Sequence, residues 1–238
     1  MLSSLVSEWT FDNPANIGED TWGSNHCSLV VPAGLSNPEI RTDDCISNTC
    51  LYFENDIGLN EAGSYLNCGS LSTPIKIWTI ELWIKTSQTG KMPFTIGNVS
   101  IYGNSGIAWG GNTWYPGIGD VCNNKWHHLV FTYSETNHIN GNNVFAYVDG
   151  KLVAEGNKNW PPVKSPIFIG CGYGWGKPNG STYPYKGLID EIRIYDNHMS
   201  ISQIKQNYIA GLDSMLRKGT LSKHEYNERL EALANVDF

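Results

Sequence analysis

Tryptophan and tyrosine residues gather in two stretches of this 238-residue chain that are rich in glycine and asparagine, 101–119 and 171–185. A sugar ring has an apolar face and a rim of hydroxyl groups, so its recognition requires flat aromatic side chains beside amides and carboxylates. Both stretches offer this mixture. The predicted ligand-binding residues are Trp109, Trp114, Tyr115, Tyr173, Trp175 and Tyr185. The alternative for each ring is burial at an end of the fold.

A second group of residues with chemical potential is acidic. Asp12 ends a short N-terminal strand pattern, and the loop from Asn13 to Asp20 is dense in carboxylates and amides. Such oxygen atoms are the ligands that Ca²⁺ prefers. The sequence therefore suggests a calcium site, with capping of turns or pairing with Arg193 as the alternative.

Catalysis by a pair of carboxylates is not favoured. Glycoside hydrolysis needs two carboxylates facing one cleft, and on a strand only alternate residues share a face. Asp190 and Glu191 are adjacent, so we expect them to point to opposite faces, and Glu81 has no acidic neighbour two or four residues away. His127 and His128 diverge for the same reason, which favours packing and hydrogen bonding over metal binding. We predict no catalytic residues.

The elements that position these residues are strands. Residues 124–133 and 143–153 are rich in β-branched and aromatic side chains, and Asp149-Gly150 is a strong signal for a tight hairpin turn. Residues 77–85 alternate, with Trp78, Ile80, Leu82 and Ile84 expected in the core and Glu81 and Trp83 on the other face. Short strands with long loops between them predict an all-β fold, a two-sheet antiparallel sandwich or jelly roll.

The C-terminal tail changes to a helical period. Ser200 begins a capping box, Gly219 is a stop signal, and Ser222 is a second cap. We expect two domains, residues 1–209 as the sandwich and 210–238 as a helical hairpin. The apolar stripe of residues 211–235 predicts either packing on the sandwich or docking to a partner chain or second copy.

Composition limits the partners and the compartment. The net charge is -7, and the 16 Lys and Arg residues form no basic stripe, which excludes nucleic acid and anionic membrane as favoured partners. Six cysteines without zinc-site spacing favour disulfides in an oxidising compartment, and Cys45 and Cys50 are close enough in sequence to pair. We expect a secreted or surface-displayed fragment whose targeting or anchor segment has been removed.

Five motifs in order resemble the laminin-G-like jelly rolls of the concanavalin A-like lectin and glucanase superfamily. They are Trp9-x-Phe11-Asp12, the strand 80–84, Trp126-His127-His128, Tyr147-Val148-Asp149-Gly150, and the segment 187–195. The resemblance covers residues 5–209. It implies a structural Ca²⁺ where the first and last strands meet, with Asp12, Asp20 and Asp190 as its ligands. Residues 211–226 are similar to the small helical hairpin called SHOCT.

These patterns together predict a non-enzymatic binding module of the cell exterior, with glycan recognition and adhesion as its role. The runner-up is a structural or protein-interaction head of a pilus-like surface assembly, and a glycoside hydrolase or lyase is third. Laminin-G-like modules also occur behind prepilin-type anchors, which would suit the expected removal of an N-terminal segment.

Overall fold

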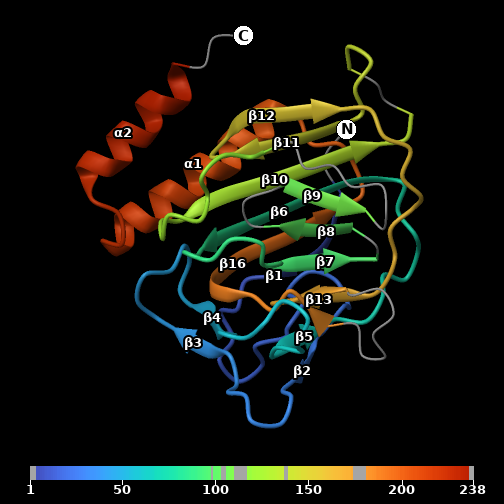
Figure 1. Ribbon diagram of the computed structural model, residues 1–238. Coiled ribbons are helices and arrows are strands. Elements are labelled where there is room, and N and C mark those ends of the chain that lie inside the picture. The colour runs from blue at the N-terminus through green and yellow to red at the C-terminus, as the bar shows by residue number, and fades with distance from the viewer. Residues whose placement is uncertain are drawn as a thin grey trace.

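The computed structural model describes residues 4–97, 99–102, 106–109, 117–136, 139–173 and 181–235. In these residues two antiparallel sheets pack face to face, and two helices follow at the C-terminus. Figure 1 shows β7, β8 and β9 of the smaller sheet in front of the larger sheet and α1 behind it. The predicted two-sheet antiparallel sandwich with a helical hairpin is confirmed.

The larger sheet has eight strands among the residues described. Their order is β12 (Lys151–Gly156), β11 (Val144–Val148), β10 (His127–Ser134), β6 (Ile77–Lys85), β16 (Lys186–Tyr195), β4 (Cys50–Glu54) and β3 (Glu39–Arg41), with β1 (Leu5–Trp9) paired to β16. The first and last strands of the chain therefore meet at the middle of this sheet.

The smaller sheet has six described strands. Their order is β2 (Ser28–Val30), β5 (Tyr65–Asn67), β13 (Ile167–Ile169), β7 (Phe94–Ile96), β8 (Val99–Tyr102) and β9 (Gly106–Trp109). A short pair, β14 (Gly172–Tyr173) and β15 (Ser181–Thr182), lies outside both sheets.

Alternation along the strands sends apolar side chains between the sheets. Trp78, Ile80, Leu82 and Ile84 of β6 lie in the central core, as do Leu129, Phe131 and Tyr133 of β10. Glu81 and Trp83 lie on the opposite face of β6, as predicted. The Asp149-Gly150 turn is also confirmed, because both residues have positive φ angles, 50° and 75°, and join β11 to β12.

The outer face of the larger sheet is covered by α1 (Ile201–Lys218), which is followed by α2 (Lys223–Ala234). Ser200 forms the predicted capping box, Gly219 ends α1 with a φ of 77°, and Ser222 caps α2. The boundary expected after residue 209 falls in the middle of α1. The helical tail therefore begins at Ile201, and α1 shows no break at position 210.

The apolar stripe of the tail is used within the chain. One buried cluster joins Leu212 and Met215 of α1, Leu221 of the turn and Leu233 of α2 to the sheet residue Trp83. Packing on the sandwich, one of the two predicted alternatives, is thus observed. Docking of a partner or second copy through residues 211–235 stays a prediction for the outward side of the hairpin, and so does the SHOCT resemblance.

Disulfides close two loops. The predicted Cys45–Cys50 bond is present, and Cys27 is bonded to Cys68.

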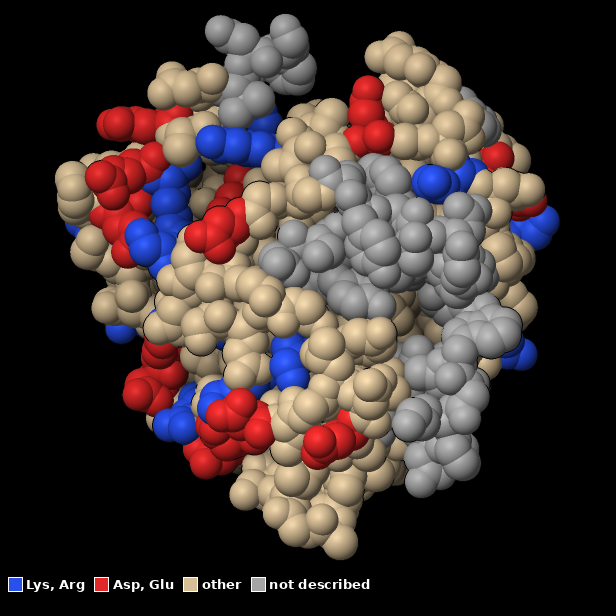
Figure 2. Space-filling view, viewed as in Figure 1, with Lys and Arg blue, Asp and Glu red and all other residues tan. Residues whose placement is uncertain are grey.

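The surface charge is mixed. On the face shown in Figure 2, Lys and Arg side chains are interspersed with Asp and Glu. Neither α1 nor α2 is long and apolar enough to cross a membrane.

Candidate binding site

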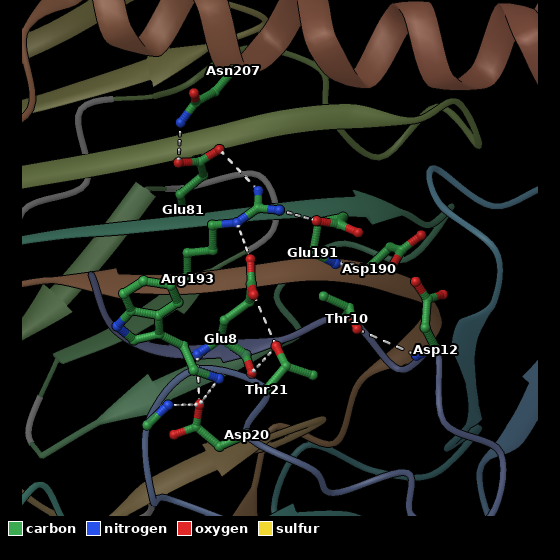
Figure 3. Close-up of polar contacts among 12 residues, drawn as sticks. Glu8, Thr10, Asp12, Asp20, Thr21, Glu81, Asp190, Glu191, Arg193 and Asn207 are labelled. Atoms are coloured by element: carbon green, nitrogen blue, oxygen red, sulfur yellow. Dashed lines mark hydrogen bonds and ion pairs between the residues drawn. The ribbon is translucent and has the colours of Figure 1, made fainter. Parts of the chain in front are cut away.

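Arg193 is the centre of a carboxylate cluster on the outer face of the larger sheet (Figure 3). Its Nε lies 2.7 Å from Glu8 Oε1 of β1, its Nη1 lies 3.6 Å from Glu81 Oε1 of β6, and its Nη2 contacts Glu191 Oε2 of β16. Three strands thus each supply one carboxylate to a single guanidinium. These carboxylates outweigh the effect of burial and raise the pKa of Arg193.

Glu81 connects this cluster to α1. It is fully buried, and its Oε1 lies 3.0 Å from Nε2 of the equally buried His128. Asn207 of α1 donates from Nδ2 to Glu81 Oε2 at 2.8 Å. Burial favours the neutral acid, but the contacts with His128, Arg193 and Asn207 outweigh it and lower the pKa of Glu81. The expected packing and hydrogen-bonding role of His128 is confirmed.

A bulge in β16 changes where its two acidic residues point. The pairing of β16 with β6 shifts register between Asp190 and Arg193, and Glu191 has a φ of 52°. Asp190 accepts hydrogen bonds from the N–H groups of Ile46 and Ser47, and the Ser47 hydroxyl lowers the pKa of Glu191 by hydrogen bonding. The expectation that Asp190 and Glu191 point to opposite faces is therefore wrong. Both face the loop that contains Ser47.

Burial is the main influence on the protonation of these two residues. Burial is the main cause that raises the pKa of Asp190 well above its ordinary value, and the Glu191 charge adds to the effect. Burial also raises the pKa of Glu191, although Arg193 and Ser47 oppose the shift. A carboxylate of raised pKa on a strained residue beside a cavity is typical of functional sites.

The three predicted calcium ligands accept hydrogen bonds from N–H and hydroxyl groups. Asp20 accepts from the N–H groups of Glu8, Trp22, Gly23 and Asn25, which makes it the anchor of the 20–25 turn. Asp12 accepts from Thr49 N at 2.8 Å and Ser47 Oγ at 3.2 Å. Figure 3 shows Asp12 near Asp190 and Asp20 well apart from both. In the described part of the chain no group of three His, Cys, Asp or Glu side chains is placed to hold a metal ion.

Calcium binding here stays a prediction, and chelation tests it. An ionised carboxylate has about four acceptor sites, so one that already accepts N–H groups can still coordinate a cation. If the predicted ion binds, the melting temperature should fall in excess EDTA and recover when Ca²⁺ is added beyond the chelator, because a ligand that binds only the folded state raises its stability. Equal melting temperatures with and without EDTA would contradict the prediction.

A pocket of about 290 Å³ opens beside the Arg193 cluster, between the sheet and α1. The sheet supplies Trp83, Glu191, Arg193 and Tyr195, the helix supplies Asn207, Ala210, Gly211 and Ser214, and the 46–47 loop closes one end. A Cβ on Gly211 would lie only 2.3 Å from Trp83 Cζ2, so glycine allows α1 to approach the sheet at this point. The pocket combines aromatic, carboxylate, guanidinium, amide and hydroxyl groups.

The predicted aromatic residues are placed only in part. Tyr185 is fully buried and its hydroxyl donates to Leu188 O, so it is a core residue and the prediction that it stacks on a ligand is wrong. Trp109 and Tyr173 belong to β9 and β14, but their side chains lie outside the description. Trp114, Tyr115 and Trp175 lie outside the described residues and stay predictions.

The sequence reasoning missed the cross-strand cluster because it sought paired acids along one strand. Glu8, Glu81 and Glu191 are far apart in sequence and meet only through strand pairing. The one sequence signal that pointed to this face was Trp83, an aromatic residue on the otherwise polar side of β6. The reasoning also missed Trp22, whose side chain is 65% exposed on the turn that Asp20 anchors.

Comparison with known proteins gives one family match. The sequence pattern of the concanavalin A-like lectin/glucanases superfamily matches residues 60–205. No curated protein matches the chain.

Several solved structures share the fold. Domain 4 of a GH43 extracellular arabinanase from Geobacillus stearothermophilus, in complex with arabinotriose, is 20% identical with a TM-score of 0.59, and the match covers 86% of this chain and 98% of that domain. The binding domain of Paraclostridial mosquitocidal protein 1 is 15% identical with a TM-score of 0.59, covering 88% of this chain and 53% of that one. Trypanosoma rangeli sialidase is 16% identical with a TM-score of 0.55, covering 86% and 33%.

Proposed function

The chain belongs to the concanavalin A-like lectin/glucanase superfamily, and from this premise we propose that it is a non-catalytic module that binds glycans outside the cell. The two disulfides suit an oxidising compartment. The arabinanase domain with the same fold was solved with a bound trisaccharide, which supports a sugar ligand.

The pocket between α1 and the sheet is the observation that carries this proposal. Small-ligand sites combine apolar walls with a few fixed polar groups. Trp83 and Tyr195 provide apolar surface, while Glu191, Asn207 and Ser214 provide hydrogen-bonding groups for hydroxyls. The exposed ring of Trp22 and the aromatic loops predicted from the sequence would add stacking surfaces elsewhere on the module.

The arrangement of the carboxylates supports binding rather than hydrolysis. A glycosidase needs one carboxyl to donate a proton and another to attack or activate water. Here Arg193 lies between Glu8, Glu81 and Glu191 and holds all three, and Glu81 is fully buried. Such a cluster is suited to fixed hydrogen bonding.

Filling the pocket from the helix tests the proposal. Ala210 lines the pocket at an exposed position of α1, so Ala210→Trp should occupy it without disturbing the core. We expect glycans that bind the wild type on an array to bind this variant at least about tenfold more weakly, a loss of about 1.4 kcal/mol. Titration calorimetry with the best array ligand measures the loss.

Gln206→Trp is the matched control, because Gln206 is exposed on the same helix and does not line the pocket. Both variants should have the same melting temperature as the wild type. An array on which the wild type binds no glycan rejects the function, and equal binding by Ala210→Trp rejects this location for it.

A further inference from the structure

Among the residues that the structure describes, Arg193 supplies the only guanidinium that lines the α1 pocket, and the protein already uses it. Arg193 directs Nε to Glu8, Nη1 toward Glu81 and Nη2 to Glu191, so each of its three nitrogens faces a carboxylate of the chain. A guanidinium binds a carboxylate ligand best through two parallel N–H groups on one edge. Two of these contacts are hydrogen bonds, to Glu8 and Glu191, and the third is an ion pair, so carboxylates of the chain already balance the positive charge that would attract an acidic ligand.

Most of the other polar groups of the pocket present acceptors. Asn207 uses Nδ2 to bind Glu81, which fixes the amide and leaves Oδ1 as the atom available to a ligand (Figure 3). The single hydroxyl proton of Ser47 is within reach of the carboxylates of Asp12 and Glu191, so the protein already uses it and the Ser47 oxygen can accept. Glu191 only accepts hydrogen bonds when it is ionised, whereas the Ser214 hydroxyl can donate or accept. A ligand that supplies hydrogen-bond donors therefore suits most of these groups.

The charge around the pocket also favours a ligand with a cationic group, because acidic side chains outnumber basic ones there. Five carboxylates, those of Glu8, Asp12, Glu81, Asp190 and Glu191, surround the pocket floor and its 46–47 end wall. The basic groups beside them are Arg193, Lys218 and, when it is protonated, His128, which lies 3.0 Å from Glu81. Lys218 Nζ donates to the carbonyl oxygen of Asn48 at 3.2 Å. Burial is the main cause that raises the pKa of Asp190, and the nearby charges of Glu191 and Asp12 raise it further.

We propose that the α1 pocket selects saccharides that carry a free amino group, such as oligomers of glucosamine, over neutral and acidic ones. An ammonium group supplies three N–H donors and a positive charge to an acceptor-rich, negatively charged pocket. Glu191 and Asn207 Oδ1 are the groups that recognise it. An acidic sugar meets repulsion and a guanidinium whose charge is already paired with three carboxylates of the chain. The inference rests on the proposed glycan binding at this pocket and names its ligand class.

Three trimers of similar size test the selectivity: glucosamine, N-acetylglucosamine and galacturonate. In titration calorimetry at low salt and pH 6, we expect the glucosamine trimer to bind at least about tenfold more tightly than the N-acetylated trimer. The galacturonate trimer should bind most weakly. Added salt should reduce the preference for the amine, because it screens charges.

Equal or tighter binding of either other trimer overturns the inference. A wild type that binds none of the three trimers but binds other glycans on the array overturns the inference and leaves the proposed function in place. Failure on both the array and the trimers rejects both.

Two variants locate the selectivity in this pocket. Glu191→Gln keeps the hydrogen-bonding shape and removes the charge, so the preference for the amine should fall to about threefold or less. Glu39→Gln is the matched control, since Glu39 pairs with Arg41 on the same sheet and does not line the pocket. A preference that persists in Glu191→Gln contradicts the assignment.

Ser214→Lys provides a second test of the selectivity, which can be used if Glu191→Gln folds poorly. Ser214 is a partly exposed residue of α1 that lines the same pocket, so its replacement leaves the cluster intact and adds a cation. We expect the galacturonate trimer to gain at least about tenfold in affinity and the glucosamine trimer to lose a similar factor. An unchanged order of the trimers overturns the inference.

Discussion

Replacing Glu81 with glutamine is expected to destabilise the protein by about 3 kcal/mol, at the lower end of the range for breaking a buried ion pair. Glu81 is fully buried. It is hydrogen-bonded to His128 Nε2 and Asn207 Nδ2 and forms an ion pair with Arg193 Nη1. A glutamine amide keeps one acceptor oxygen and turns an N–H₂ group toward the other donors. Arg193 retains Glu8 and Glu191, which limits the loss. Urea unfolding at pH 7 measures the change in free energy.

Glu8→Gln is the control for this effect. Glu8 binds the same guanidinium at 2.7 Å, but its side chain is about one fifth exposed, so water compensates for much of the loss. We expect a cost of about 1 kcal/mol or less. Equal costs for the two variants would contradict the view that burial gives Glu81 its importance.

The pH dependence of the Glu81→Gln effect gives a second measurement. Because the folded state lowers the pKa of Glu81 below its ordinary value of 4.5, the unfolded chain binds more protons at this group when the pH falls. The stabilisation by Glu81 is therefore complete above pH 4.5 and is lost on further acidification. The difference between wild type and Glu81→Gln should shrink between pH 5 and pH 3. A difference that stays constant over that range contradicts the assigned direction.

Local patterns predicted the frame of the fold because each depends on neighbouring residues only. The strand at 77–85, the positive φ angles of Asp149-Gly150 and the caps at Ser200 and Ser222 all follow from short-range geometry. The face assignment of β6 succeeded for the same reason, since alternation is fixed by the backbone. These signals require no knowledge of which strands become neighbours.

The candidate site was beyond such reasoning because strand pairing and a bulge create it. Glu8 is 185 residues from Arg193 in sequence, and their contact exists only because β1 pairs with β16. The bulge at Asp190-Glu191 breaks the alternation from which opposite faces were inferred. The prediction that Tyr185 binds a ligand was wrong for a related reason. Its position among turn-forming residues gave no sign that its ring fills the core.

Covering a sheet face with a helix created the pocket that the sequence did not reveal. The outer face of β6 carries Glu81 and Trp83, which would be an ordinary half-exposed surface without α1. Asn207, Ala210 and Gly211 turn that surface into a cavity with a helical wall. The binding properties proposed for this module therefore depend on its C-terminal hairpin as much as on the sandwich.

Gly211→Ala tests that dependence by the sign of a stability change. In an unconstrained helix this substitution stabilises by about 1 kcal/mol, because alanine has the higher helix propensity. Here the new Cβ would lie 2.3 Å from Cζ2 and 2.9 Å from Cε2 of Trp83, a ring that is almost completely buried and cannot move aside freely. Overpacking of this kind costs about 1–3 kcal/mol. We expect a net loss, seen as a lower midpoint in urea.

Trp83→Phe provides the rescue that separates a clash from a general defect of α1. Phenylalanine removes the second ring, including the atoms Cζ2 and Cη2 that a Cβ at position 211 would meet. In a double-mutant cycle, Gly211→Ala should therefore destabilise the wild type and be neutral or stabilising beside Trp83→Phe. Additive effects, or stabilisation by Gly211→Ala alone, would show that α1 does not need glycine to approach the sheet. The expected coupling would tie the wall of the pocket to the contact between one glycine and one tryptophan.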